Sequence, residues 1–175
     1  MIKSTLLVIA ALIVVLLIYA STRPDSFRVE RSARIQAPPE RLHALINDMH
    51  AFNTWNPYAR KDPSMKGSYA GPPQGTGAAY AWESDKVGTG RLEIVESAAP
   101  DTVAMKLDFI KPFEAHNTAA FTIQPEADAT RVTWSMQGPV PYVGKIMHLF
   151  FDMDRIVGKD FEEGLVNLKA LAEAG

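Results

Sequence analysis

Histidines near carboxylates or amides are the side chains of this chain best suited to acid–base chemistry. His148 and Asp152 are four residues apart, the spacing at which a carboxylate can orient an imidazole on one face of a helix. Both project away from the apolar stripe expected on that helix, which indicates a solvated surface pair. His116 precedes Asn117 in an expected strand and lies on its outward face, which disfavours a role as a base or a ligand contact.

Metal or cofactor chemistry has no support in the sequence. His43 and His50 fall on the first helix expected in the domain, with no acidic cluster at ligand spacing, and the chain has no cysteine for a zinc site. Asp152 and Asp154 are typical of a charged helix edge. The sequence also contains no nucleophile elbow, glycine-rich phosphate loop or dinucleotide fingerprint. We therefore predict no catalytic residue, no metal site and no cofactor.

Seven strands are expected to position these side chains. The first covers residues 27–35, where Arg31 falls on the otherwise apolar face. The others cover residues 65–70, 78–84, 90–98, 102–110, 115–124 and 130–137, and the GPPQGTG segment at 71–77 is a turn. Because most connections between them are short, the strands should pair antiparallel as a meander.

Helices are predicted on either side of these strands. Pro38 and Pro39 suit the first turn of a helix that runs to about residue 48. Residues 52–58 are too short and too rich in asparagine and proline to form more than a turn of helix or a loop. A further helix is expected over residues 142–157. Gly158 follows it and should break or kink the chain before the final helix.

The C-terminal helix has the densest helix signals. Asp160 can cap its first turn, and Glu163 can reach back to complete a capping box. An apolar stripe then recurs at three- and four-residue steps: Phe161, Gly164, Leu165, Leu168 and Leu171. A run of strands closed by such a helix predicts an α+β fold, in which an antiparallel sheet carries helices on one face and can enclose a cavity.

The N-terminal segment predicts a transmembrane anchor over residues 4–22. Residues 6–20 are wholly apolar, and a helix over the anchor, rising about 1.5 Å per residue, would span roughly 28 Å, close to the thickness of the hydrocarbon core of a bilayer. Residues 23–26 would form a tether, in which Pro24 stops the helix. The expected protein is a single-pass protein of the cell membrane.

Two other interpretations of this segment stay open. Lys3 supplies the short basic start of a cleaved signal peptide, although Ile18 stands where a cleavage site before Ser21 needs a small residue. A buried core helix is the third interpretation. Basic residues near a membrane helix favour the cytoplasmic face, and here Lys3 and the amino terminus stand before the helix and Arg23 after it. The later arginines belong to an expected strand, so only Arg23 is a clear juxtamembrane charge on the domain side. We therefore place the domain on the non-cytoplasmic side.

The charge of the remaining domain, residues 27–175, disfavours nucleic acid as a partner. The chain has a formal net charge of −2 at pH 7, and the basic residues Lys3 and Arg23 lie outside the domain. Nucleic-acid binding and polybasic docking to a membrane both need a basic surface. The lipid bilayer is therefore expected as a partner only through the N-terminal helix.

The order of the elements resembles the helix-grip fold of the SRPBCC superfamily, which includes polyketide cyclase/dehydrase-like proteins, START lipid-transfer domains and the birch-pollen allergen group. The matching segments are Trp55-Asn56-Pro57, Gly75-Thr76-Gly77 and the run from Gly158 to Lys169. These motifs mark turns and helix caps, so they bear on the fold and not on the activity. The resemblance covers residues 27–173. It implies a seven-stranded antiparallel sheet curved around the C-terminal helix, with an apolar cavity between them.

The cavity implied by this resemblance supplies the candidate ligand contacts. On the inward face of the sheet they are Tyr80, Trp82, Met105, Phe121 and Trp134, with Met153 on the preceding helix and Trp55 and Tyr58 at the mouth. The alternative is that the aromatic residues of the sheet only fill the core and that Trp55 plugs its open end.

These expectations favour a membrane-tethered module that binds a hydrophobic small molecule, such as a lipid, an isoprenoid or a polyketide-like compound. One alternative is a cofactor-independent cyclase or dehydratase, with His116, Tyr80 and Arg31 as candidate polar residues. The other is a protein-interaction module with a vestigial cavity, which would serve a membrane protein partner. Two converging ionisable groups with shifted pKa values would favour the enzyme, and a fully packed interior would favour the interaction module.

Overall fold

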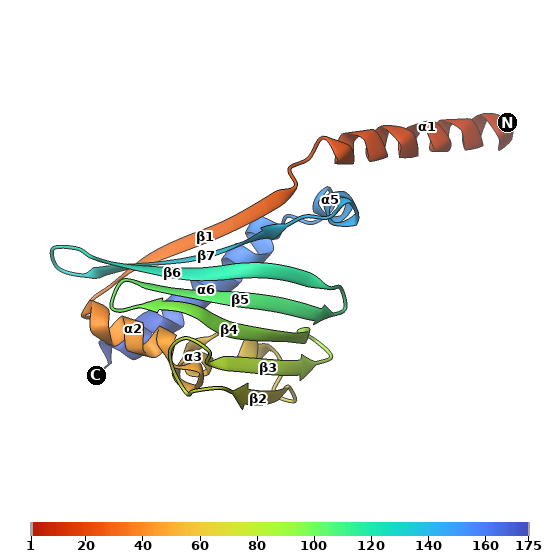
Figure 1. Ribbon diagram of the computed structural model, residues 1–175. Coiled ribbons are helices and arrows are strands. Elements are labelled where there is room, and N and C mark those ends of the chain that lie inside the picture. The colour runs from red at the N-terminus through yellow and green to blue at the C-terminus, as the bar shows by residue number, and fades with distance from the viewer. Residues whose placement is uncertain (1, 175) are drawn as a thin grey trace.

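One antiparallel sheet forms the body of the protein, which the computed structural model describes over residues 2–174 (Figure 1). Its strands are β1 (Ser26–Ile35), β2 (Lys66–Ala70), β3 (Ala79–Ser84), β4 (Gly88–Ala98), β5 (Thr102–Lys111), β6 (Ala115–Pro125) and β7 (Thr130–Pro139). Their order is β1-β7-β6-β5-β4-β3-β2, so β2 to β7 form a meander and β1 pairs with β7 at the other edge. This arrangement confirms the predicted seven-stranded α+β fold.

Three helices connect β1 to β2: α2 (Pro39–Asn47), α3 (Met49–Trp55) and α4 (Tyr58–Lys61). α5 (Tyr142–His148) follows β7, and α6 (Met153–Glu173) runs behind the sheet in the view of Figure 1. α3 is a helix of seven residues and not the single turn or loop that was expected. Its N-cap explains the difference, because the Asp48 carboxylate accepts hydrogen bonds from the backbone N–H groups of His50 at 2.8 Å and Ala51 at 3.0 Å.

α6 continues through Gly158 without a break, which corrects two expectations about the end of the chain. Its N-cap is Asp152 and not Asp160, because the Asp152 carboxylate accepts a hydrogen bond from the Arg155 backbone N–H at 3.0 Å. The interruption between the two C-terminal helices falls at residues 149–152. Asp160 therefore lies within α6 and does not cap it, and its side chain is mostly buried.

Gly158 permits a close approach between α6 and β1. A Cβ atom added there would lie 2.1 Å from Nη2 of Arg31, so a larger residue would displace the guanidinium group. Arg31 donates hydrogen bonds to the carboxylates of Asp154 at 2.9 Å and Glu162 at 2.8 Å, one turn of α6 on either side of the glycine. The arginine on the inner face of β1 thus fastens the helix to the edge of the sheet.

The apolar stripe of α6 packs against the sheet largely as predicted. Phe161, Leu165 and Leu168 are buried in the core. Leu171 is an exception, since it is 38% exposed and Ala172 occupies the buried position in the last turn. Ala172 lies four residues after Leu168 and Leu171 lies three, so the buried face of the last turn follows the four-residue step.

α1 (Ile2–Ser21) extends away from the sheet (Figure 1). Its segment Lys3–Ser21 has a mean hydropathy of 2.6 and is only 6% buried, so the interpretation as a buried core helix is wrong. Its length and composition fit a membrane span or a signal sequence. The C-terminal end of α1 contacts α5, where the Tyr142 hydroxyl donates a hydrogen bond to the Leu17 carbonyl oxygen at 2.8 Å.

Candidate ligand-binding cavity

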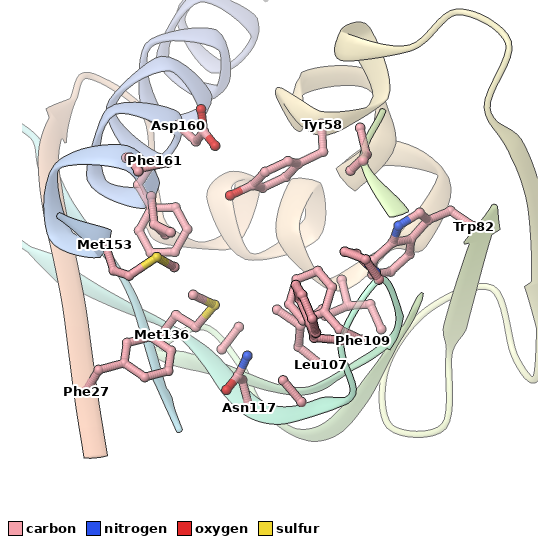
Figure 2. A pocket seen from close by; sticks show the side chains of 18 of the residues that line it. Phe27, Tyr58, Trp82, Leu107, Phe109, Asn117, Met136, Met153, Asp160 and Phe161 are labelled. Atoms are coloured by element: carbon pink, nitrogen blue, oxygen red, sulfur yellow. The ribbon is translucent and has the colours of Figure 1, made fainter. Parts of the chain in front are cut away.

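A cavity of about 820 Å³ lies between the inner face of the sheet and α6 (Figure 2). Apolar side chains supply most of its wall. They include Phe27, Leu92, Leu107, Phe109, Ala119, Met136, Ile156, Val157 and Phe161. Exposed residues of α5 and of the turn between β5 and β6 also line it, so the cavity opens to the surface at that end of the sheet. The interior is therefore not fully packed.

The cavity collects all but one of the residues that were predicted as ligand contacts: Tyr58, Tyr80, Trp82, Met105, Phe121, Trp134 and Met153. They differ in burial. Phe121 and Trp134 belong to the buried core and form the inner wall, whereas Tyr80 and Trp82 are only partly buried. The inner aromatic residues thus serve both as core and as cavity wall. Contact with a ligand remains a prediction for each of them.

Trp55 is the exception and does not line the cavity. Its side chain is buried in the core, and its indole N–H donates a hydrogen bond to the Leu45 carbonyl oxygen at 2.9 Å. Its ring lies edge-on to Phe52, Phe121 and Trp134. Trp55 therefore fills the core behind the cavity wall, and its neighbour Asn56 lines the cavity instead.

Trp134 and Phe161 join the sheet to α6 at the inner wall. Their rings stack with centroids 4.1 Å apart and an angle of 9° between the planes. Gly164 allows this packing, because a Cβ atom there would lie 2.6 Å from Cζ3 of Trp134 and 3.0 Å from Cδ of Pro57. This part of the wall is closely packed, so it sets one boundary of the space open to a ligand.

A polar cluster lies in the wall between α4 and α6. Lys61 Nζ is 2.6 Å from a carboxylate oxygen of Asp160, whose side chain is mostly buried. Burial raises the pKa of the Tyr58 hydroxyl, and the negative charge of Asp160 and a hydrogen bond to its carboxylate raise it further. Figure 2 shows the Tyr58 hydroxyl and Asp160 turned toward one another across the top of the cavity. The phenol therefore stays protonated and can donate a hydrogen bond.

Three residues of the cavity wall carry a buried side-chain polar atom without a partner among the described residues: Oδ1 of Asn117, Nε1 of Trp82 and Nε1 of Trp134. Figure 2 shows the Asn117 amide reaching inward from the sheet. Gly138 leaves it room, since a Cβ atom at that position would lie 2.0 Å from Oδ1 of Asn117. A buried polar atom left unpaired costs about 1–3 kcal/mol, so a water molecule or a ligand group that reached one of these three atoms would be stabilised there.

The residues considered for enzymatic chemistry are mostly elsewhere. His116 lies on the outer face of the sheet, where its Nδ1 is 2.6 Å from Asp108, and this carboxylate raises its pKa. Arg31 is bound to α6 and does not line the cavity. Tyr80 lines the cavity and packs beside Trp82. Of the three candidates, only Tyr80 can reach a molecule bound inside.

The other histidines are dispersed. His43 is buried, with Nε2 3.2 Å from the Ser97 hydroxyl, and burial lowers its pKa. His50 stacks on Tyr69. His148 ends α5 and lines the cavity, so it is not the surface partner of Asp152 on a shared helix. Within residues 2–174, no group of three or more histidine, cysteine, aspartate or glutamate side chains could hold a metal ion.

A sheet that holds a long C-terminal helix over an apolar cavity defines a helix-grip domain of the SRPBCC superfamily. The chain belongs to the family described as polyketide cyclase / dehydrase and lipid transport, whose model matches residues 26–173. A comparison with curated proteins found no match. Family and cavity together make this a hydrophobic-ligand-binding or cyclase-like domain.

Solved structures with the same fold come from unrelated sources. Protein CV1439 from Chromobacterium violaceum is 15% identical, with a TM-score of 0.59 over 86% of this chain and 99% of that chain. Ms6760 from Mycobacterium smegmatis is 18% identical, with a TM-score of 0.59 over 84% and 91%. Major latex-like protein 151 from Panax ginseng is 12% identical, with a TM-score of 0.60 over 85% and 99%. At these identities the likeness concerns the fold alone.

Proposed function

We propose that this protein is a membrane-tethered binding module, which holds a hydrophobic small molecule in the cavity between the sheet and α6. A lipid, an isoprenoid or a polyketide-like compound fits this description. α1 would be retained as the anchor, with residues 22–25 leading directly into β1. We place the domain on the non-cytoplasmic side of the membrane.

The size and polarity of the cavity carry the proposal. A volume of about 820 Å³ lies within the roughly 300–1,000 Å³ that is usual for small-molecule sites. Its wall is mainly aliphatic and aromatic, and burial of apolar ligand surface there is worth about 25 cal/mol per Å² before the costs of association. The few polar groups of the wall, such as the protonated Tyr58 hydroxyl, suit hydrogen bonds that orient a ligand.

The polar cluster is the one observation that favours a cyclase or dehydratase instead. Tyr58 and Asp160 converge on the cavity, but the raised pKa keeps the Tyr58 phenol protonated, which makes it a poor general base. Asp160 is already paired with Lys61. The cluster is therefore better suited to hydrogen bonding with a ligand than to transferring a proton.

A cavity-filling variant tests the binding function. Ala119 is buried in the cavity wall, so Ala119→Phe should occupy the binding space and abolish binding of an environment-sensitive apolar dye to the full chain in detergent. Trp82→Ala should weaken binding by removing wall area. The matched control is Val166→Phe, which adds the same ring type at an exposed position of α6, and His116→Ala is a second control on the outer face.

The measurement is a fluorescence titration of each variant, after circular dichroism has established that it is folded. Native mass spectrometry of the detergent-extracted protein should in addition find a co-purifying small molecule, which Ala119→Phe loses. Unchanged dye binding by both Ala119→Phe and Trp82→Ala would contradict the proposal. A substrate that is converted by the wild type and bound but not converted by Tyr58→Phe would establish the enzyme instead.

A further inference from the structure

The open end of the cavity is surrounded by exposed apolar side chains. Phe113 in the turn between β5 and β6 is 65% exposed, and Phe150 in the loop after α5 is 68% exposed. Val143 and Met147 on α5 and Phe151 after it are exposed as well. We call these five residues the apolar rim. All of them except Phe150 line the cavity, so the rim and the opening are one continuous surface.

The rim lies beside the last turns of α1. The Tyr142 hydroxyl at the start of α5 bonds the Leu17 carbonyl oxygen, and Ala20 is fully buried. Lys145 on α5 forms an ion pair with Asp25, at 2.5 Å, just before β1. These contacts hold α5 against the end of the apolar helix. In Figure 1 the turn between β5 and β6 lies at the same end of the sheet as α5 and α1.

The position of Tyr142 sets the depth of this surface relative to a membrane that α1 would cross. Leu17 lies four residues before the end of α1 at Ser21, which is about 6 Å along a helix axis. Helices that lie in the membrane interface bury their apolar face to a depth of about 5–10 Å. Tyrosine is also enriched at this level, because its ring is apolar and its hydroxyl is polar.

Exposed apolar patches of this kind mark an interaction surface, and its place beside α1 selects the partner. Lys86 and Lys111 line the same cavity, and lysine side chains near a membrane surface can extend their amine toward lipid headgroups. The chain as a whole has a net charge of −2, so attachment would rest on apolar contact and not on a basic surface.

We infer that the apolar rim docks onto the phospholipid bilayer in which α1 is embedded, so that the cavity opens directly into the acyl-chain region. This inference rests on the proposed function for the ligand, which then is a molecule dissolved in the bilayer and enters without crossing water. The docking itself depends only on the rim and on α1. The two parts can therefore be tested separately.

Single-cysteine labelling tests the docking. The natural chain has no cysteine, so Phe113→Cys and Phe150→Cys can each carry one environment-sensitive fluorophore on the full chain reconstituted into phosphatidylcholine vesicles. Controls carry the label at Val95→Cys on β4 and Val166→Cys on α6, which are exposed and outside the rim. We expect blue-shifted emission and quenching by spin-labelled phospholipid at the rim positions, and quenching by aqueous iodide at the controls.

Exchange of a fluorescent fatty acid between the vesicle and the cavity tests the route. Phe150→Asp alters the one rim residue that does not line the cavity, so it should slow uptake several-fold while the amount bound at equilibrium is unchanged, and Ala119→Phe should abolish binding. Rim labels that iodide quenches as strongly as the controls would overturn the docking, even if Ala119-sensitive binding persists. Labels shielded from both quenchers would show that protein covers the rim, which also overturns it. Lipid-quenched labels without Ala119-sensitive binding would uphold the docking and refute the ligand-binding part of the proposed function.

Discussion

Replacing Phe161 by alanine should lower the free energy of unfolding by about 3 kcal/mol. Substitutions of this type in a core cost about 3–5 kcal/mol, because they remove buried contacts and leave a cavity. Phe161 is buried and stacks on Trp134, but it also lines the existing cavity, so one side of its ring already lacks close neighbours. We therefore expect a value at the lower end of this range.

Thermal unfolding of the full chain in detergent, followed by near-ultraviolet circular dichroism, measures this effect. A loss of about 3 kcal/mol corresponds to a fall of roughly 6–12 °C in the unfolding midpoint of a domain of this size. Val166→Ala on the exposed side of the same helix is the control, and should change stability by less than about 0.5 kcal/mol. A double-mutant cycle with Trp134→Ala should give a coupling of about 0.5–1.5 kcal/mol for the stacked rings. A Phe161→Ala midpoint no lower than that of the control would refute the conclusion that the sheet grips α6.

Other perturbations address the anchor and the charged groups. The full chain should pellet with membranes and resist extraction by high salt, since salt screens charge but not apolar burial; a mature N-terminus at Ser21 or Arg23, found by sequencing, would show cleavage instead. Burial is the largest cause of the raised pKa of Tyr58 and Asp160 is the second, so Asp160→Asn should lower that pKa. The measurement is an ultraviolet titration of the phenolate, with Tyr58→Phe as the blank. An unchanged Tyr58 titration in Asp160→Asn would contradict the prediction. Asp108 raises the pKa of His116 above 6.5, so the stabilisation from this pair should be present below pH 6.5 and lost as pH rises through the raised value; in Asp108→Asn the NMR titration of the His116 ring should return toward 6.5.

The strands could be predicted from the sequence because side chains alternate across a sheet with a period of two. Residues 102–110 show this directly, and β5 covers Thr102–Lys111. The same alternation placed Met105 and Phe121 in the cavity wall, where they lie. The same alternation places Asn117 on the inner face, two residues before Ala119. The sequence therefore carried a signal for Asn117 as a residue of the cavity wall, although Asn117 was not among the predicted ligand contacts.

The start of α6 could not be predicted in the same way. Asp152 and Asp160 both suit an N-cap, and the choice between them depends on contacts that are distant in the sequence. Gly158 resembles a helix break until Arg31 of β1 is seen to occupy the space beside it. For the same reason, the pairing of Asp160 with Lys61 was missed. Trp55 was expected at the mouth of the cavity but lies in the core. A local sequence pattern shows that an aromatic residue is buried, but not whether its ring borders the cavity or fills the core behind the cavity wall.

The short connection between α1 and β1 limits how far the domain can travel. Residues 22–25 would span at most about 14 Å when fully extended. The backbone N–H of Val140 also bonds the Asp25 carbonyl oxygen at 2.7 Å, so the last of these residues is already part of the domain. With α1 retained, the protein could not shuttle its cargo from one membrane to another, as a freely diffusing carrier does. It could only store a molecule at its home membrane, or pass it to a neighbour that diffuses in the same plane.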